Sequence, residues 1–270
     1  MDELVVLKLG GGLITEKSEM CTLKPTVLSE LSKVISKLSN MNYRIIIVHG
    51  AGSFGHLKAR KWRLNEGFIE GFKPKVIDEI SNQCDAVVSV RNDMLMLNQL
   101  VVDSLQSYGI STKSHPPHEW ASGTGSKFSG NISVLEYNDG TIPVTFGDVV
   151  DCGDESIFGI LSGDDICYRV ASEMGARHMI FAMGGAEGLM SSPPNFPDSE
   201  LIPIWTSDMQ FDGEHASNID VTGGIYLKLD RAKLIAYNVP NVWILDGEKP
   251  IRIHDAIVNG NTIGTKIIHN

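Results

Sequence analysis

The residues with the clearest chemical potential form a glycine-rich stretch, His49-Gly50-Ala51-Gly52-Ser53-Phe54-Gly55-His56. It follows an apolar run, residues 45–48, that predicts a buried strand, and the residues after it can begin a helix. Glycine lets a backbone approach an anion closely at such a turn, and the first N–H groups of a helix point at it. The ring of His56 would lie just inside the helix and could add a donor. The stretch therefore predicts a phosphate-binding site.

Two alternatives apply to this stretch. Gly50, Gly52 and Gly55 formally match the dinucleotide-binding fingerprint, which requires a following strand that ends in an acidic residue. Residues 61–75 are polar and interrupted by glycine and proline, so they predict no such strand. The chain also has no Gly-x-x-x-x-Gly-Lys-Ser/Thr loop. A turn that needs glycine for its geometry alone is the second alternative.

A lysine stands inside another apolar stretch, residues 4–9, which is followed by Gly10, Gly11 and Gly12. A lysine within an apolar strand is costly unless its ammonium group reaches water or an anion. Lys8 is therefore either an edge-strand residue that points to solvent or a ligand of a bound anion. The three glycines predict a second backbone loop at a strand end.

Acidic and glycine-rich stretches follow in the second half of the chain. Asp164 and Asp165 stand at the start of a predicted helix, after Ser162 and Gly163. Such acids commonly interact with the helix dipole, and they could equally organise lysines or magnesium near phosphates. Further glycine-rich stretches occur at residues 184–188 and 220–224, and Lys228 follows the second of these by about one helical turn.

Length and composition restrict the class of protein. A chain of 270 residues with 42% hydrophobic residues fits one large or two small globular domains. The formal net charge of −10 argues against nucleic acid or an anionic membrane as a partner. We see neither an apolar run of membrane-spanning length nor a signal-peptide pattern. The cysteines are widely spaced without a CxxC pair, which predicts reduced thiols in a cytoplasmic protein and no metal site: Cys21, Cys84, Cys152 and Cys167.

The expected elements alternate between strand and helix. Apolar patterns predict strands at residues 4–9, 43–48, 142–146, 177–182, 241–245 and 263–268, and helices at residues 25–38, 76–105, 164–174 and after residue 250. Residues 149–152 and 156–160 flank a Gly-Asp turn and predict a β-hairpin. We expect an α/β fold, a three-layer αβα sandwich with a mainly parallel central sheet, with the site at the carboxyl edge of that sheet.

Taken together, these stretches resemble the amino acid kinase superfamily, and within it the branch of isopentenyl phosphate kinases. The motifs occur in the family's order over nearly the whole chain: Lys8-Leu9-Gly10-Gly11 with Lys17, the stretch from His49 to His56, Gly147-Asp148-Val149, Ser162-Gly163-Asp164-Asp165-Ile166, and Asp220-Val221-Thr222-Gly223-Gly224 with Lys228. The glycine loop that ends in histidine is the most specific motif, because it separates this branch from kinases of amino-acid carboxylates.

The resemblance implies a role for each matching residue. Lys8, Lys17 and Lys228 would contact the ATP phosphates and the phosphoryl group in flight, and Asp164 would position these lysines. The nucleotide would also contact Gly10, Gly11, Gly12, Gly52, Glu187 and Gly224. The acceptor's phosphate would contact Ala51, Gly52, Gly55, His56 and Gly159. Met94 and Met96, in the predicted helix 76–105, either pack in the core or, as adaptable side chains, form the wall around the acceptor's tail, for which they are our candidates.

The resemblance also implies an activity. A single amino acid kinase domain would span residues 1–270, with an acceptor-binding part at about 1–160 and a nucleotide-binding part at about 161–270. It would transfer phosphate from ATP, with Mg²⁺, to a small isoprenoid monophosphate, converting isopentenyl phosphate to isopentenyl diphosphate. Family relatives are commonly homodimers, so a cytoplasmic homodimer is expected. An acceptor that is already a phosphate monoester is anionic at neutral pH and needs no general base, which agrees with a histidine donor in the site.

Two departures from the family pattern keep other functions open. Gly12 replaces a common serine, and residues 183–188, Met-Gly-Gly-Ala-Glu-Gly, replace the usual Thr-Asp-Val-Asp-Gly. Glu187 can stand in for one of the two acids. The alternatives are a kinase of another small phosphate or phosphonate, as in the fosfomycin kinases that resemble this branch, and a non-catalytic nucleotide-binding sensor.

Overall fold

The computed structural model describes residues 3–16, 19–75, 79–206, 208–209 and 224–269. At its centre the described residues form an eight-stranded sheet with the order β10-β12-β11-β9-β1-β2-β6-β3. The strands are β1 Leu4–Leu9, β2 Arg44–His49, β3 Thr112–Ser114, β6 Ile142–Phe146, β9 His178–Met183, β10 Ile204–Thr206, β11 Asn241–Asp246 and β12 Thr265–Ile268. Within this sheet β11 and β12 pair antiparallel and the other neighbours pair parallel, which confirms the predicted mainly parallel sheet.

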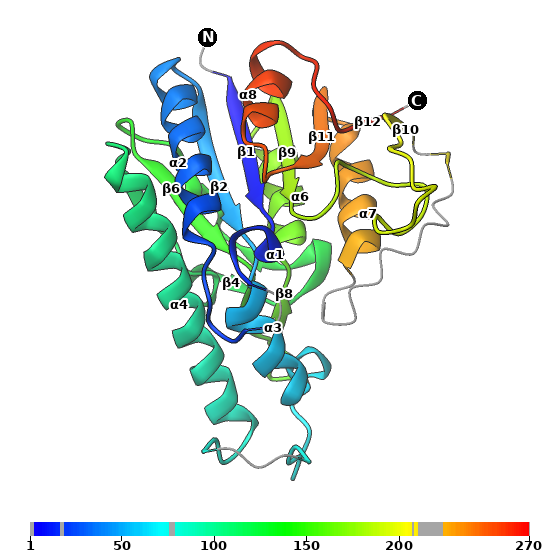
Figure 1. Ribbon diagram of the computed structural model, residues 1–270. Helices are drawn as coiled ribbons and strands as arrows, with labels where there is room; N and C mark the ends of the chain where they lie inside the picture. Colours follow the sequence, from blue (N-terminus) through cyan, green and yellow to red (C-terminus); the bar gives the residue numbers. More distant parts are fainter. Residues whose placement is uncertain (1–2, 17–18, 76–78, 207, 210–223, 270) are drawn as a thin grey trace.

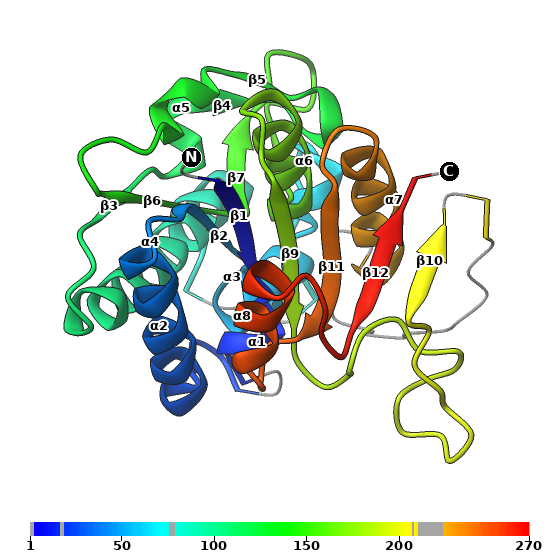
Figure 2. The same cartoon turned by 90° about the horizontal axis from the view of Figure 1, so that it is seen from above.

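Helices cover both faces of the sheet (Figures 1 and 2). One face carries α2 (Pro25–Asn40), α4 (Gln83–Ser107) and α8 (Ile251–Val258), and the other carries α6 (Gly163–Glu173) and α7 (Gly224–Ala236). Two helices lie at the carboxyl ends of the central strands, α1 (Gly11–Ile14) and α3 (Gly52–Lys61). The predicted three-layer αβα sandwich is confirmed. Among the described residues, we find no helix both long and apolar enough to cross a membrane.

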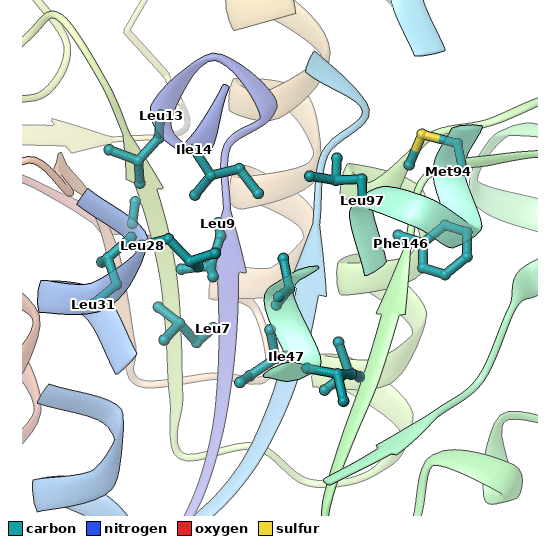
Figure 3. Packing of buried hydrophobic residues seen from close by; sticks show 14 of the residues in the cluster. Leu7, Leu9, Leu13, Ile14, Leu28, Leu31, Ile47, Met94, Leu97 and Phe146 are labelled. Carbon is teal, nitrogen blue, oxygen red and sulfur yellow. The ribbon is translucent and has the colours of Figure 1, made fainter. Parts of the chain in front are cut away.

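The side chains of β1 alternate between two hydrophobic cores. Leu7 and Leu9 pack with residues of α2 and α4 (Figure 3), whereas Leu4 and Val6 pack with residues of α6 and α7. A central parallel strand is buried on both faces, which explains the continuous apolar run in the sequence. Lys8 shares the parity of Leu4 and Val6, so its side chain points toward the α6 and α7 layer. Since β1 lies between β9 and β2, the edge-strand alternative for Lys8 is wrong.

A second, smaller sheet extends the carboxyl end of β6. It has the order β5-β4-β7-β8, formed by β4 (Ala121–Ser122), β5 (Ser129–Gly130), β7 (Asp148–Asp151) and β8 (Phe158–Leu161). β7 and β8 pair antiparallel, which confirms the predicted hairpin. The remaining short elements are the helix α5 (Pro117–Trp120) and the 3₁₀ turns η1 (Leu64–Glu66), η2 (Gly125–Lys127) and η3 (Ile132–Leu135).

Four elements differ from the sequence-based expectation. The helix predicted at 76–105 begins at Gln83, because the Asn82 side chain caps it and accepts a hydrogen bond from the Asp85 N–H at 3.0 Å. Residues 76–78 lie outside the described residues. The glycines expected to form a loop after β1 instead begin the short helix α1. The short edge strands β3 and β10 have no strand pattern of their own and exist through pairing with β6 and β12.

The two glycine-rich stretches pack directly against each other at the ends of β1 and β2. The Gly50 N–H donates to the Leu9 carbonyl at 2.8 Å, which holds the loops together. A Cβ atom on Gly11 would lie 2.2 Å from the Gly52 nitrogen, and one on Gly52 would lie 2.0 Å from Thr15 Oγ1. Gly52 also has a φ of +50°, which favours glycine. Close backbone approach therefore requires glycine here whether or not an anion binds.

We expect the substitution Gly11→Ala to lower the free energy of unfolding by about 1–3 kcal/mol, because the added methyl group must displace backbone rather than a flexible side chain. Urea unfolding of the two proteins measures this difference. Gly153→Ala is the control, since a Cβ at Gly153 has no heavy atom of the described residues within 4 Å. Equal unfolding midpoints for wild type and Gly11→Ala would contradict the packing argument.

Candidate active site

A cleft of about 770 Å³ lies at the carboxyl ends of the central strands. The two glycine-rich stretches contribute Gly10, Gly11, Gly12, Gly50, Ala51, Gly55 and His56 to its lining. The starts of α6 and α7 contribute Ser162, Gly163, Asp164, Gly224 and Lys228, and β1 contributes Lys8. The cleft therefore joins segments from both halves of the sequence at the edge of the sheet where ligands of open α/β folds bind.

The centre of the cleft holds two lysines on one carboxylate. The Lys8 ammonium group contacts Asp164 Oδ1, and the Lys228 ammonium group lies 3.1 Å from Oδ1 and 3.3 Å from Oδ2 of the same side chain. Lys8 and Asp164 are buried, with 7% and 4% of their surface exposed. Lys228 Nζ also lies 5.2 Å from the ring centroid of Phe181, within cation–π distance. Strands β1 and β9 and helices α6 and α7 thus meet at one charged cluster.

The start of α6 is built to present Asp164. The Ser162 side chain is the N-cap and accepts a hydrogen bond from the Asp164 N–H at 3.2 Å. Gly163 leaves room for the lysine, because a Cβ there would lie 3.3 Å from Lys8 Cε. Burial by itself would raise the pKa of Asp164, but the neighbouring Lys228 and Lys8 outweigh burial and hold the pKa below its ordinary value. Asp164 is therefore a carboxylate at neutral pH.

One end of the cleft is apolar. Beyond His56, its lining consists of side chains from α3, α4 and the β7–β8 hairpin, which we call the apolar end: Ala59, Val90, Met94, Val149 and Ile160. Gly55 permits close contact between α3 and α4, since a Cβ there would lie 3.1 Å from Met94 Sδ. A donor-rich region thus leads directly into a hydrocarbon-lined space, which suits a ligand with an anionic head and an aliphatic tail.

Ion pairs hold α4 in place on both sides of the apolar end. The Lys58 ammonium group on α3 donates to Ser89 Oγ at 2.7 Å and also pairs with Asp93. On the other side, Arg91 Nε donates to the Val149 carbonyl at 2.8 Å. These contacts flank Val90 and Met94, so they set the distance from α4 to α3 and to the hairpin.

The opposite end of the cleft, which we call the β9 end, is formed by residues 183–186, 193–196 and 224–226. Phe196 and Tyr226 bring aromatic side chains to it, and these are 57% and 50% exposed. Glu187 does not belong to the described lining of the cleft. Its carboxylate instead accepts a hydrogen bond from Arg252 Nη2 at 2.7 Å, and this bond lowers the pKa of Glu187.

The chain was compared with known proteins, and residues 3–246 match the amino acid kinase family. The chain belongs to the amino acid kinase family. Isopentenyl phosphate kinase from Thermoplasma acidophilum is 31% identical over 98% of this chain and 100% of its own length. The isopentenyl phosphate kinase of Arabidopsis thaliana is 27% identical over 89% of this chain and 86% of its own length.

Solved structures give the same result. The crystal structure of an isopentenyl phosphate kinase substrate complex matches with a TM-score of 0.79 and 27% identity, over 98% of this chain and 99% of that one. A UMP kinase from Ureaplasma parvum shares the fold at 13% identity, with a TM-score of 0.62 and 99% of each chain covered. The predicted resemblance to isopentenyl phosphate kinases within the amino acid kinase family is confirmed.

The structure brings together most of the residues that the family resemblance assigned. Those that line the cleft are Lys8, Gly10, Gly11, Gly12, Ala51, Gly55, His56, Asp164, Gly224 and Lys228. Gly52 lies behind Gly11, in backbone contact with it. Gly159 lines a second cavity of about 680 Å³, which shares Ile160 and Ser162 with the cleft. Lys17 lies outside the described residues. The roles assigned to all of these residues stay predictions.

Of the two methionines that the sequence analysis proposed for the wall around the acceptor's tail, the structure places one in the lining of the apolar end. Met94 lines the cleft, but Met96 is 47% exposed and is not part of the described lining, so its assignment to the wall is wrong. Successive helical residues are separated by about 100°, so two residues that are two positions apart face different directions. Val90 stands four positions before Met94 and shares its face, a helical spacing that could have identified it. Val149, Ile160 and Phe196 carry no comparable signal.

His49 connects the glycine-rich stretch after β2 to helix α4. Its ring is buried, lies 5.0 Å from the Phe146 ring in a stacked arrangement, and places Nε2 3.3 Å from Asn98 Oδ1. Burial lowers the pKa of His49 from 6.5 to about 4, although contacts with Gly50, Asn98 and Asp148 act in the opposite direction. The ring is therefore neutral at pH 7 and belongs to the frame of the glycine loop.

We expect His49 to make folding pH-dependent. The unfolded chain binds a proton at His49 near pH 6.5, whereas the folded chain does so near pH 4, so stability falls as the pH drops through this window. The loss amounts to about 3 kcal/mol at pH 4. Urea unfolding of wild type and His49→Gln at pH 7 and pH 4 isolates this loss, because the remaining groups titrate in both proteins. The same pH dependence in both would exclude the effect.

Proposed function

We propose that this protein is an ATP-dependent kinase that phosphorylates isopentenyl phosphate to isopentenyl diphosphate. One observation carries the proposal. A single cleft contains two lysines paired with a buried aspartate, the exposed backbone of two glycine-rich stretches, and an end lined by hydrocarbon side chains. The family membership and the isopentenyl phosphate kinases among the relatives support it.

The charged cluster suits phosphoryl transfer. This reaction depends mainly on positioning and on stabilising the charge that spreads over the phosphate oxygens. Lys8 and Lys228 carry two positive charges and Asp164 one negative charge, so the cluster has a net charge of +1. Asp164 holds the two ammonium groups together before the nucleotide binds. Both can then donate to phosphate oxygens without a large rearrangement of the chain.

The acceptor would bind with its phosphate near His56 and its tail in the apolar end. The imidazole ring of His56 and the backbone N–H groups at the start of α3 are donors that suit a phosphate group. Ala59, Val90 and Met94 suit a short branched hydrocarbon, because such a tail binds by excluding water and offers no polar groups. The phosphate oxygen is already anionic, so attack on the γ-phosphorus needs no general base.

ATP would extend from the cluster toward the β9 end, where Gly224 lies, in keeping with a nucleotide-binding part at about residues 161–270. Magnesium commonly binds through substrate phosphates with few protein ligands. The described residues offer no group of three His, Cys, Asp or Glu that could hold a metal, which fits an ion carried largely by ATP. When bound, Mg²⁺ would neutralise part of the negative charge of the phosphate groups.

The proposal is tested by coupled ADP release with Mg-ATP and isopentenyl phosphate, with fosfomycin as a parallel acceptor. We expect turnover with isopentenyl phosphate, and the diphosphate product is identified by mass spectrometry. Turnover with fosfomycin but not with isopentenyl phosphate would show that the acceptor is a phosphonate. ATP binding without transfer to either acceptor would instead favour the non-catalytic sensor.

We expect His56→Ala to raise the KM for isopentenyl phosphate by roughly 10-fold or more, because a hydrogen bond to a charged phosphate is lost. The dissociation constant for ATP, measured by calorimetry, should stay close to that of wild type. His254→Ala is the matched control, because His254 lies on α8, in the helical layer on one face of the sheet, and is not part of the described lining of the cleft. Equal weakening of ATP binding and acceptor binding would contradict the assignment of His56 to the acceptor site.

A further inference from the structure

A second ion pair joins α6 to α7 directly beside the Asp164 cluster. Arg231 Nε donates to Asp165 Oδ1 at 2.6 Å. Asp165 is buried with 3% of its surface exposed, and the Arg231 side chain is 16% exposed. Asp164 and Asp165 are consecutive in the first turn of α6, whereas Lys228 and Arg231 are three positions apart on α7 and share one face of that helix. The two ion pairs therefore connect the same two helical segments.

The apolar contacts of α7 are less directional than these ion pairs. Figure 2 shows α6 and α7 side by side on one face of the sheet, and α7 buries an apolar stripe in the core there: Ile225, Leu229, Ala232 and Ile235. Hydrophobic burial depends on area and has little directional preference. A charge-assisted hydrogen bond from a guanidinium group fixes both distance and angle. Arg231 thus supplies what the apolar stripe lacks, a defined register between the helices.

Net stability is a poor explanation for this pair. Burial raises the pKa of Asp165 above its ordinary value, even though Arg231 acts to lower it. The free energy needed to remove two charges from water is commonly as large as the free energy gained from their attraction. A pair of apolar residues of similar size could therefore stabilise the fold equally well. A geometric role accounts better for a buried aspartate and arginine at this position.

We propose that Arg231, paired with Asp165, is a positioning residue that sets the register of α7 on α6 and thereby places the Lys228 ammonium group beside Lys8. The inference rests on the proposed function, in which Lys228 binds the ATP phosphates and stabilises the transferred phosphoryl group. Arg231 is not part of the described lining of the cleft, so it acts through Lys228 rather than on the substrates.

The first test is the substitution Arg231→Gln. We expect kcat to fall roughly 10- to 100-fold, because a small displacement of a catalytic group is enough for such a loss. The KM for isopentenyl phosphate should change little, since the apolar end is formed by α3, α4 and the β7–β8 hairpin. Asp165→Asn should reproduce the loss, and Arg231→Lys should restore part of it. Lys233→Gln is the control on the same helix, where Lys233 lies 4.3 Å from the Trp205 ring centroid.

The second test combines Arg231→Gln with Lys228→Ala. If Arg231 acts through Lys228, the double variant loses no more turnover than Lys228→Ala alone. Losses that multiply, or a kcat of Arg231→Gln equal to that of wild type, would overturn the inference. Thermal unfolding confirms that each variant is folded, and Asp165→Asn replaces Arg231→Gln if that variant is not.

Calorimetric ATP binding separates this inference from the proposed function. Arg231→Gln should weaken ATP binding in the wild-type background and leave it unchanged in the Lys228→Ala background. Equal weakening in both backgrounds would overturn the positioning role. A wild-type protein that binds ATP without phosphorylating isopentenyl phosphate would contradict the proposed function, while the two binding comparisons would still decide the role of Arg231.

Discussion

The contact of two lysine ammonium groups with one buried carboxylate is the constraint on which the rest of the site depends. In a region of low dielectric constant, Lys8 and Lys228 would repel each other strongly without Asp164 between them. Their convergence requires β1, α6 and α7 to meet, although more than half of the chain separates β1 from the two helices. Three features place these groups: the alternation of side chains along β1, which turns Lys8 toward α6 and α7, the helix cap at Ser162, and the space left by Gly163.

The two glycine-rich stretches impose a second constraint. Gly11, Gly50 and Gly52 approach so closely that side chains are excluded, and this part of the cleft floor is therefore backbone. Backbone donors suit an anion, but the same glycines are required for packing alone. The phosphate-binding and turn-geometry interpretations of the glycine stretch are thus compatible, because one arrangement of the backbone satisfies both.

In the proposed function, one part of the cleft would perform the chemistry and another would select the acceptor. The charged cluster comes from the large sheet and the α6–α7 layer, whereas the apolar end comes from α3, α4 and the β7–β8 hairpin. Lys58 and Arg91 hold α4 in place with polar contacts that do not involve the cluster. Changes in acceptor size can therefore be accommodated without moving Lys8 or Asp164, and the fold alone does not specify the acceptor.

The sequence by itself determined the central strands, the main helices, the hairpin and the glycine-rich turn after β2, because apolar periodicity and glycine chemistry are local properties. The resemblance of its motifs to the family also selected Lys8, Asp164 and Lys228; their roles stay predictions, and the structure brings the three side chains together. The tertiary structure alone decided that Met94 and not Met96 faces the cleft, that Glu187 pairs with Arg252, and that Asp165 meets Arg231. These outcomes depend on helix rotation and on the register between elements far apart in sequence, which short-range patterns do not encode.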